Sequence, residues 1–250
     1  MYAWVQHCLS KLLFILVCSS IYSESIKVSI VIPVYNESSR VSALAQELQA
    51  LVPTPEVLFV DGSSQDDTVQ KIQQAGALVV TSLTKGRGAQ LNRGIEEAQG
   101  EFLLFLHADC HLSQQAYAAM IQALDLGCYE GGAFSFQLDN SEHDWRERLI
   151  EKGVSLRNAL FGLVYGDQGY FVKKESLSKI GFFKEMPLME DVEWFGRLKE
   201  GKKYILLKEK LPTSGRRIHK RGWIKSCFTN LFIVTLYKLG VSPQKLAEIY

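Results

Sequence analysis

The sequence has 250 residues and a nearly balanced formal charge of +1, with 28 Lys and Arg against 27 Asp and Glu. This length corresponds to one large domain, or one domain with a small appendage, and a hydrophobic fraction of 47% is ample for its core. The balanced charge argues against a general nucleic-acid-binding protein. A local basic excess at 197–225 fits a phosphate-bearing substrate, an anionic membrane surface or a solvated basic face.

The N-terminal residues have the layout of a secretory signal, because Lys11 precedes the apolar run 12–17 and small residues follow. The run is too short to span a bilayer as a helix. An uncleaved extension that touches a membrane and an over-long start are two further interpretations, and all three stay open. Five scattered cysteines without a CxxC pair favour a reducing compartment and argue against structural zinc.

The first half of the chain alternates between predicted strands and helices. Short apolar runs bounded by polar or turn residues predict strands, and apolar residues at helical spacing predict helices. The strands cover 27–34, 56–60, 77–80 and 102–106, and the helices cover 39–51, 68–75, about 88–100 and 113–124. This repeat predicts a doubly wound α/β sheet, mostly parallel, with right-handed crossovers and helices on both faces.

The strand at 102–106 is the reference point for the site, because it is an unbroken apolar run and should be buried on both faces. It ends in His107 and Asp109, and a buried strand cannot carry an unpaired carboxylate, so Asp109 should lie where the strand emerges. Polar residues also follow the first two strands, at 36–37 and 61–67. Ligands bind at the carboxyl ends of such strands, so these clusters predict one crevice. Alternatively, Asp109 caps a turn before the next helix.

The second half of the chain is less regular. It predicts strands at 131–138 (with one face exposed), 170–173 and 204–207, and helices at 145–161, from 189, and at 223–239. The last helix is apolar over most of its circumference and follows a basic segment. That combination is typical of an interfacial membrane contact, and packing on the domain is an equal alternative. The expected division is an N-terminal extension at 1–24, one domain at 25–222 and a C-terminal helical segment at 223–250.

Several motifs in fixed order resemble the family 2 glycosyltransferases. They are 33–37 (PVYNE), 61–64 (DGSS) with Asp67, a strand that ends in x-x-Asp, and the helix start at 189–191. The segments LLFLHADC, YGDQGYFV, PLMEDVEW, SGRR and LYKLGVSPQKLAEIY are similar to the subgroup called radical-SAM/selenodomain-associated transferases. The resemblance covers about 25–250. It implies a GT-A-type α/β fold with a C-terminal helical extension, and metal-assisted, inverting transfer of a sugar from a nucleotide-diphosphate sugar to an unknown acceptor hydroxyl.

The resemblance also implies roles for individual residues. Asp191 matches the catalytic base, although an acidic pair also simply favours a helix N-terminus. Asp109 matches the carboxylate that holds Mn²⁺ or Mg²⁺ against the diphosphate. His107 departs from the usual Asp-x-Asp, and it is either a second metal ligand or a hydrogen-bond donor to the nucleotide. The residues expected at the nucleotide or the acceptor are Pro33, Tyr35, Glu37, Asp61, Ser63, Asp67, Lys85, Arg87, His107, Asp167, Gln168, Glu190, Arg216 and Arg217.

Within that set, the carboxylates of Glu37, Asp61 and Asp67 are expected to hold the nucleoside, because they accept from ribose hydroxyls and base N–H groups. Lys85 and Arg87 would meet the base or phosphates, or belong to a surface loop. Asp167 and Gln168 are expected on the acceptor side. Arg216 and Arg217 would neutralise the diphosphate, although the usual Gln-x-x-Arg-Trp form is absent.

Two other functions compete with this interpretation. A nucleotidyltransferase would share the acidic crevice, but it should carry a Gly-rich basic loop directly after the first strand, where this chain has 33–37 (PVYNE). A degenerate, non-catalytic nucleotide-binding protein is disfavoured by the presence of both Asp109 and Asp191. The expected partners are the nucleotide sugar, the acceptor and a membrane surface, and not nucleic acid. The expected location is the cytoplasm, with the option of attachment to the inner face of the membrane.

Overall fold

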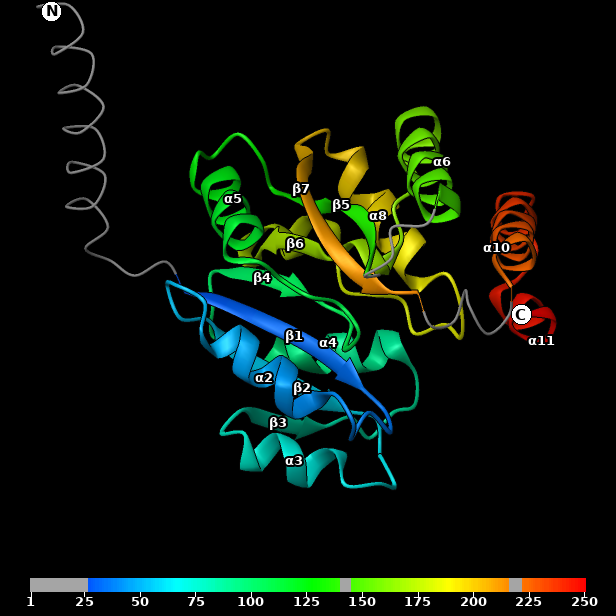
Figure 1. Cartoon of the computed structure of the whole chain (residues 1–250). Coiled ribbons are helices and arrows are strands. Elements are labelled where there is room, and N and C mark those ends of the chain that lie inside the picture. Colours follow the sequence, from blue (N-terminus) through cyan, green and yellow to red (C-terminus); the bar gives the residue numbers. More distant parts are fainter. Residues whose placement is uncertain (1–26, 140–144, 216–221) are drawn as a thin grey trace, which may run out of the picture.

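The computed structural model describes residues 27–139, 145–215 and 222–250 (Figure 1). Among them, seven strands form one sheet in the order β3-β2-β1-β4-β6-β5-β7. Their bounds are β1 (Val28–Val34), β2 (Glu56–Asp61), β3 (Leu78–Thr81), β4 (Phe102–Phe105), β5 (Gly131–Asp139), β6 (Tyr170–Lys173) and β7 (Tyr204–Ser214).

The sheet is mixed but mostly parallel. β3, β2, β1 and β4 are parallel neighbours, and so are β5 and β7. β6 lies between β4 and β5 and is antiparallel to both. The expected α/β fold class is therefore confirmed. The apolar run at β4 is buried on both faces, as predicted, with one parallel and one antiparallel neighbour.

Helices cover both faces of the sheet, because successive strand residues point to opposite sides. Ile30 and Ile32 of β1 pack with α2 and α5 on one face, whereas Val31 packs with α4 and α8 on the other. The helix bounds are α2 (Val41–Gln49), α3 (Thr68–Gln74), α4 (Arg87–Glu97), α5 (Gln114–Asp125), α6 (Trp145–Phe161), α7 (Leu177–Ile180), α8 (Glu190–Glu200), α10 (Trp223–Lys238) and α11 (Pro243–Ile249), with short 3-10 turns η1 (Gly166–Gln168) and η2 (Lys174–Ser176).

The two C-terminal helices, α10 and α11, lie next to each other at the right-hand side of the molecule in Figure 1. They attach through a small apolar cluster in which Met189 contacts Ile233 and Val234 of α10 and Leu246 of α11. α10 therefore sits against the segment that precedes α8. That contact brings the end of the chain to the carboxyl edge of the sheet.

Two sequence-based predictions need correction. The strand expected at 204–207 extends to Ser214, and the charged residues 208–210 belong to it, because β7 pairs with β5 along its whole length around a bulge. The strand at 131–138 does not have one exposed face: positions 131–134 are buried on both sides, and only Ser135 and Gln137 are half-buried. Long-range strand pairing decides both features, and local sequence patterns do not reveal it.

No helix within residues 27–139, 145–215 or 222–250 is both long enough and apolar enough to cross a bilayer. The apolar segment at 1–24 and the residues Arg216 and Arg217 lie outside the described residues. The expected division of the chain at residue 222 stays a prediction.

Candidate active site

Asp109 is fixed by the distant end of β7. After β4, the chain turns so that the N–H of Cys110 donates to the carbonyl of His107 at 3.2 Å. The next residues pair with the end of β7: Cys110 forms an antiparallel bridge with Thr213, and the Ser214 N–H donates to the Asp109 carbonyl at 3.0 Å. Helix α5 is capped instead by Ser113, whose hydroxyl accepts from Ala116. Asp109 therefore does not cap that helix.

Arg87 is the first residue of α4 and connects three other groups. Its Nε donates to the carboxylate of Glu190, one Nη lies 3.6 Å from Oδ2 of Asp191, and the other lies 3.3 Å from Nε2 of His107. A guanidinium can only donate, so Nε2 of His107 accepts and the ring proton sits on Nδ1. The preceding Gly86 has φ of 119°, a conformation open to glycine, and it lets the loop enter the helix at this angle.

Asp191 is oriented by backbone groups. Its Oδ2 accepts from the Gly166 N–H at 2.9 Å, and its Oδ1 accepts from the Val192 N–H at 2.8 Å. A Cβ at residue 166 would lie 2.8 Å from Nε2 of His107 and 3.3 Å from Oδ2 of Asp191. Only glycine leaves room for the imidazole and the carboxylate to approach the η1 backbone so closely.

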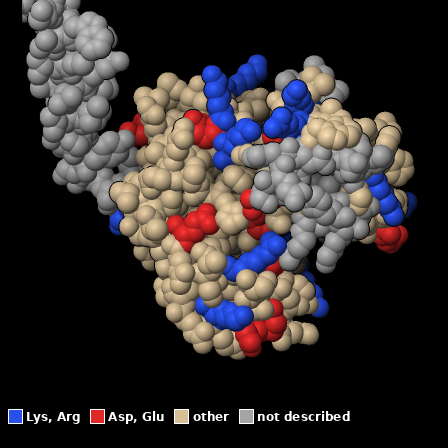
Figure 2. All heavy atoms as spheres, in the orientation of Figure 1, with Lys and Arg blue, Asp and Glu red and all other residues tan. Residues whose placement is uncertain are grey.

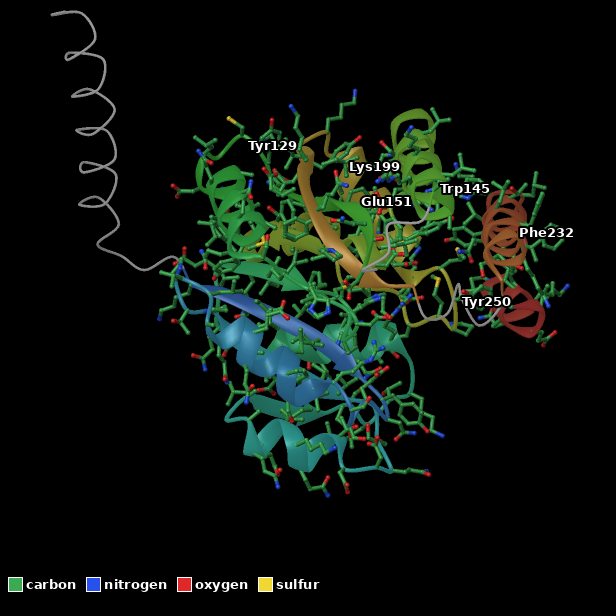
Figure 3. All side chains as sticks on the ribbon, viewed as in Figure 1. Tyr129, Trp145, Glu151, Lys199, Phe232 and Tyr250 are labelled. Carbon is green, nitrogen blue, oxygen red and sulfur yellow. The ribbon has the colours of Figure 1, made fainter. Side chains whose placement is uncertain are left out.

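A pocket of about 200 Å³ brings five of the expected residues together: Arg87, His107, Asp109, Asp167 and Asp191. They come from α4, the end of β4, η1 and the start of α8. We call these five residues the charged wall. The lining also includes apolar side chains, here called the apolar wall: Phe136, Leu138, Leu188, Val192, Ile233 and Val234. Tyr250 also lines the pocket and lies between α11 and the body of the molecule (Figure 3). The pocket lining therefore combines charged and apolar side chains.

Burial, together with neighbouring charges, shifts the pKa values of several groups at the charged wall. Burial raises the pKa of Asp167 to about 6, with Arg157 opposing and Asp191 and Asp109 adding to the shift. The Oδ1 atom of Asp167 is buried without a hydrogen-bond partner among the described residues. Burial also raises the pKa of Glu190, against the effect of Arg87. Although burial alone disfavours its charge, Asp191 and Glu190 raise the pKa of Arg87 above its ordinary value.

The loops after β1 and β2 form a second unit at the same edge of the sheet. The Asp61 side chain is buried, and its oxygens accept from the N–H groups of Ser63 and Ser64 at 3.0–3.2 Å. The Glu37 N–H donates to the hydroxyl of Thr68 at 2.9 Å. Asp66, rather than Asp67, holds the two loops together, because its carboxylate accepts from the N–H of Ser38 and from the N–H and hydroxyl of Thr68.

The backbone at this edge is held in unusual conformations. Asn36, Ser63 and Met189 have φ of 53°, 70° and 73°, in the left-handed region that residues other than glycine rarely adopt. They follow β1, follow β2 and precede α8, respectively. Such residues persist only where surrounding contacts determine them, and they concentrate at functional sites.

The other expected residues fall outside the pocket lining. Pro33 is within β1, Tyr35 is 55% exposed beyond it, and Lys85 is exposed in the loop before α4. Gln168 is fully buried; its amide donates to the Phe134 carbonyl and accepts from Arg157 and Asn158. Glu37, Asp61, Ser63 and Asp67 belong to the loop unit, and Glu190 lies beneath Arg87. Their roles remain predictions.

The oxygen atoms at the pocket suit a hard divalent cation that takes only one or two ligands from the protein and its other ligands from a bound substrate and water. No group of three or more His, Cys, Asp or Glu side chains within the described ranges is arranged to hold a metal. Mg²⁺ and Mn²⁺, however, often take one or two carboxylates from the protein and their other oxygens from phosphates and water. Asp109 offers such a carboxylate, whereas Nε2 of His107 already accepts from Arg87.

Sequence patterns did not identify several residues at this edge. Gln90, one turn after Arg87, is buried, and its amide donates to the carbonyls of Val34 and Val60 at 2.9 and 2.7 Å, joining the ends of β1 and β2. Arg157 stacks 3.7 Å from the ring centre of Tyr165, which lines the pocket. Gln90 belongs to no recognisable sequence motif. Its polar side chain at a position on the apolar side of α4 was the one feature of the sequence that could have marked it.

Charge on the molecular surface is mixed. On the face shown in Figure 2, acidic and basic side chains are interspersed, with several basic ones along the upper edge. This pattern differs from the continuous basic surface of a nucleic-acid-binding protein.

Comparison with known proteins gives consistent findings. The model of Glycosyl transferase family 2 matches residues 29–181. An undecaprenyl-phosphate 4-deoxy-4-formamido-L-arabinose transferase from Pseudomonas syringae is 27% identical over 159 residues, which are 58% of this chain and 46% of that protein. A dolichol-phosphate mannosyltransferase from Saccharomyces cerevisiae is 24% identical, over 40% of this chain and 42% of that protein. The chain thus spans less than half the length of these two relatives.

Solved structures show the same fold. Glucosyl-3-phosphoglycerate synthase from Mycobacterium tuberculosis, in complex with Mn²⁺, UDP-glucose and phosphoglyceric acid, superposes with a TM-score of 0.58 at 17% identity, over 87% of this chain and 81% of that one. The same enzyme in complex with Mg²⁺ and UDP gives a TM-score of 0.57 at 17% identity, over 79% and 75% of the two chains.

Proposed function

The chain belongs to glycosyl transferase family 2, and from this membership we propose that it transfers a sugar from a nucleotide-diphosphate sugar to an acceptor hydroxyl with inversion at the anomeric carbon. One observation carries the proposal: Asp109, Asp191 and Arg87 come from three distant segments and line one pocket at the carboxyl edge of the sheet. A metal-binding carboxylate, a base and a cation for phosphates are the groups that this reaction needs.

The nucleoside binds at the loop unit after β1 and β2, beside Tyr35, Glu37 and Asp61. The hydrogen bonds that join these loops support this assignment, because they preorganise the backbone that would meet a planar base. Lys85 and Arg87 then face the diphosphate. Arg87 suits this task because its planar fork binds phosphate oxygens in pairs.

Asp109 would hold Mn²⁺ or Mg²⁺, whose remaining ligands would come from phosphate oxygens and water. When bound, the cation withdraws charge from the departing diphosphate as a Lewis acid. His107 acts as a hydrogen-bond donor through Nδ1–H rather than as a metal ligand. The contact between its Nε2 and Arg87 supports this choice.

Asp191 takes the proton of the acceptor hydroxyl as that oxygen attacks the anomeric carbon. The two backbone N–H groups that bind its carboxylate support the role, since they hold the oxygens in fixed directions at the pocket. Asp167 and the apolar wall lie on the acceptor side. Arg216 and Arg217, outside the described residues, would add positive charge near the diphosphate.

The finer classification is also a proposal. We propose membership of the radical-SAM/selenodomain-associated subgroup from the resemblance of the segments quoted above, and a location in the cytoplasm, where nucleotide sugars are made. The names of the two relatives contain undecaprenyl phosphate and dolichol phosphate, which are lipid phosphates, and this supports a site of action close to a membrane.

Calorimetric titration with UDP and with GDP, in the presence of Mn²⁺ or Mg²⁺, tests the proposal. We expect metal-dependent binding by the wild-type chain, and its loss in Asp109→Ala, because Asp109 is the proposed metal ligand. Asp125→Ala, at the exposed end of α5, is the matched control and should bind normally. A wild-type chain that binds no nucleoside diphosphate, or an Asp109→Ala variant with unchanged affinity, would overturn the assignment. A hydrolysis screen with nucleotide sugars then identifies the donor.

A further inference from the structure

Helix α10 exposes large apolar side chains to solvent along one side. Phe228, Leu231, Phe232 and Leu239 are 70%, 61%, 54% and 75% exposed. At about 100° per residue, Phe228, Phe232 and Leu239 fall within about 40° of one another around the helix, with Leu231 beside them. We call these four residues the outer stripe. Phe232 points away from the body of the molecule (Figure 3).

The opposite side of α10 lines the active-site pocket. Ser226, Thr229, Asn230, Ile233 and Val234 all contact that cavity, and Ile233 and Val234 are buried. By the same helical geometry, these residues are centred about half a turn from the outer stripe. The side of α10 that lines the pocket is therefore mixed, with polar and apolar residues, and the more apolar outer stripe is the side that the described residues leave exposed.

The charged side chains of α10 itself are all basic. α10 contains no Asp or Glu in its sequence. Lys225 and Lys238 are exposed and flank the stripe near the two ends of the helix, whereas α11 carries one exposed residue of each sign, Lys245 and Glu248. An apolar stripe bordered by lysines matches an anionic bilayer interface, which offers hydrocarbon below and negative headgroups above.

We propose that the outer stripe of α10 docks the protein on an anionic membrane surface, with the helix lying in the interface. This mode suits a helix that is too short and too polar to cross a bilayer. Because the stripe and the pocket lining are two sides of one helix, docking holds the pocket close to the headgroups. If the proposed function holds, an acceptor hydroxyl carried by a membrane amphiphile reaches the apolar wall directly.

Vesicle sedimentation with the full-length chain tests the docking. The variant Phe228→Gln/Phe232→Gln replaces the two aromatic residues of the outer stripe with glutamine, which has a good helix propensity. We call it the stripe variant. We expect its partitioning onto vesicles of phosphatidylglycerol and phosphatidylcholine in equal parts to fall by about tenfold or more, since binding scales with buried apolar area. Leu78→Gln/Leu126→Gln, on exposed positions of β3 and beyond α5, is the matched control and should bind as wild type.

The electrostatic part is tested separately. Lys225→Gln should weaken binding to the anionic vesicles by about fivefold, the usual contribution of one surface lysine, and leave binding to pure phosphatidylcholine unchanged. Equal binding by the wild type, the stripe variant and the control would overturn the proposal. So would a wild-type dimer that the stripe variant dissociates without any vesicle binding, because the face would then be a contact between two copies.

Nucleotide titration of the same variants separates this inference from the proposed function. The stripe variant should bind UDP or GDP with the wild-type affinity, because the four residues do not line the pocket. If the wild type and the control bound vesicles but neither they nor the stripe variant bound a nucleotide, the proposed transferase function would be wrong, whereas the docking proposal would still be supported.

Discussion

At the scale of single residues, Arg87 and Glu190 fix each other. Glu190 is almost fully buried, and a buried carboxylate without a partner is costly, so its contact with Arg87 stabilises both positions. The two residues are 103 positions apart in the chain. The sequence predicted each of them near the nucleotide, but no spacing pattern links a loop–helix junction to a distant helix start. The contact between Arg87 and Glu190 could therefore be identified only from the structure.

We expect Arg87→Lys to lower kcat/KM by about 10–100-fold, the equivalent of one charge-assisted hydrogen bond lost or misplaced. A single ammonium cannot reach Glu190, Asp191 and His107 together. Steady-state kinetics with the donor identified by the hydrolysis screen measures the effect. Arg93→Lys, on the exposed side of the same helix, is the control. Equal loss in both variants would mean that Arg87 acts only through helix stability.

We expect Asp191→Asn to lower kcat by about 10²–10⁴-fold, the usual contribution of general-base catalysis, with little change in donor affinity. The amide oxygen can still accept from the Gly166 N–H, so the local geometry is retained, but the amide is not basic. Single-turnover kinetics combined with calorimetric donor titration separates the two effects. A near-normal kcat would place the base elsewhere.

At the scale of elements, the strands and helices of the first half were predictable because each is a short apolar run with clear breaks. Their loops were predictable only in composition. In the acidic loop after β2, the sequence gives no reason to prefer Asp67 over Asp66. The structure gives the bridging role to Asp66, which meets Ser38 and Thr68, while Asp67 precedes α3 without a side-chain cap. The contacts between the loops after β1 and β2 therefore distinguish Asp66 from Asp67, and these contacts are visible only in the structure.

This difference predicts a pH effect. The hydrogen bond from the Thr68 side chain is the main cause that lowers the pKa of Asp66 from 3.8 to about 2. Because the folded pKa lies below the unfolded one, the stabilisation is present above pH 3.8 and is lost as the pH falls toward 2. Asp66→Asn should therefore lower the melting temperature at neutral pH, with the difference vanishing in acid. Asp67→Asn should show no such trend in the same thermal melts, and matching curves would refute the bridging role.

At the scale of the whole molecule, the mostly parallel α/β sheet followed from the strand–helix alternation, whereas the antiparallel β6, the long β7 and the covering of the pocket by α10 did not. These features depend on pairing between segments far apart in the chain. The apolar helix near the C-terminus was foreseen, but apolar residues occupy most of its circumference, so the sequence does not indicate which side faces the protein. Only its neighbours show that one side lines the pocket and the other is bare.

The buried carboxyl of Asp167 makes global stability depend on pH. Burial raises its pKa from 3.8 to about 6, so the folded state prefers the protonated form and loses stability as the pH rises from about 4 to 6. Asp167→Asn should match wild type below pH 4 and be more stable above pH 6, in thermal melts with EDTA. Asp125→Asn, exposed at the end of α5, is the control. A constant offset across pH would contradict the explanation.

The bridge between Cys110 and Thr213 also sets the order in which the site is assembled during synthesis. The partners are 103 residues apart, so at about 5–20 residues per second the ribosome needs roughly 5–20 s to deliver the second after the first. During that interval, β1 to β4 and the loops after β1 and β2 are already available, while Asp109 lacks its partner strand and Asp191 is made only late in the interval. A nascent chain can thus form its nucleoside-side loops but not its reaction centre, and activity begins only when the last strand is in place.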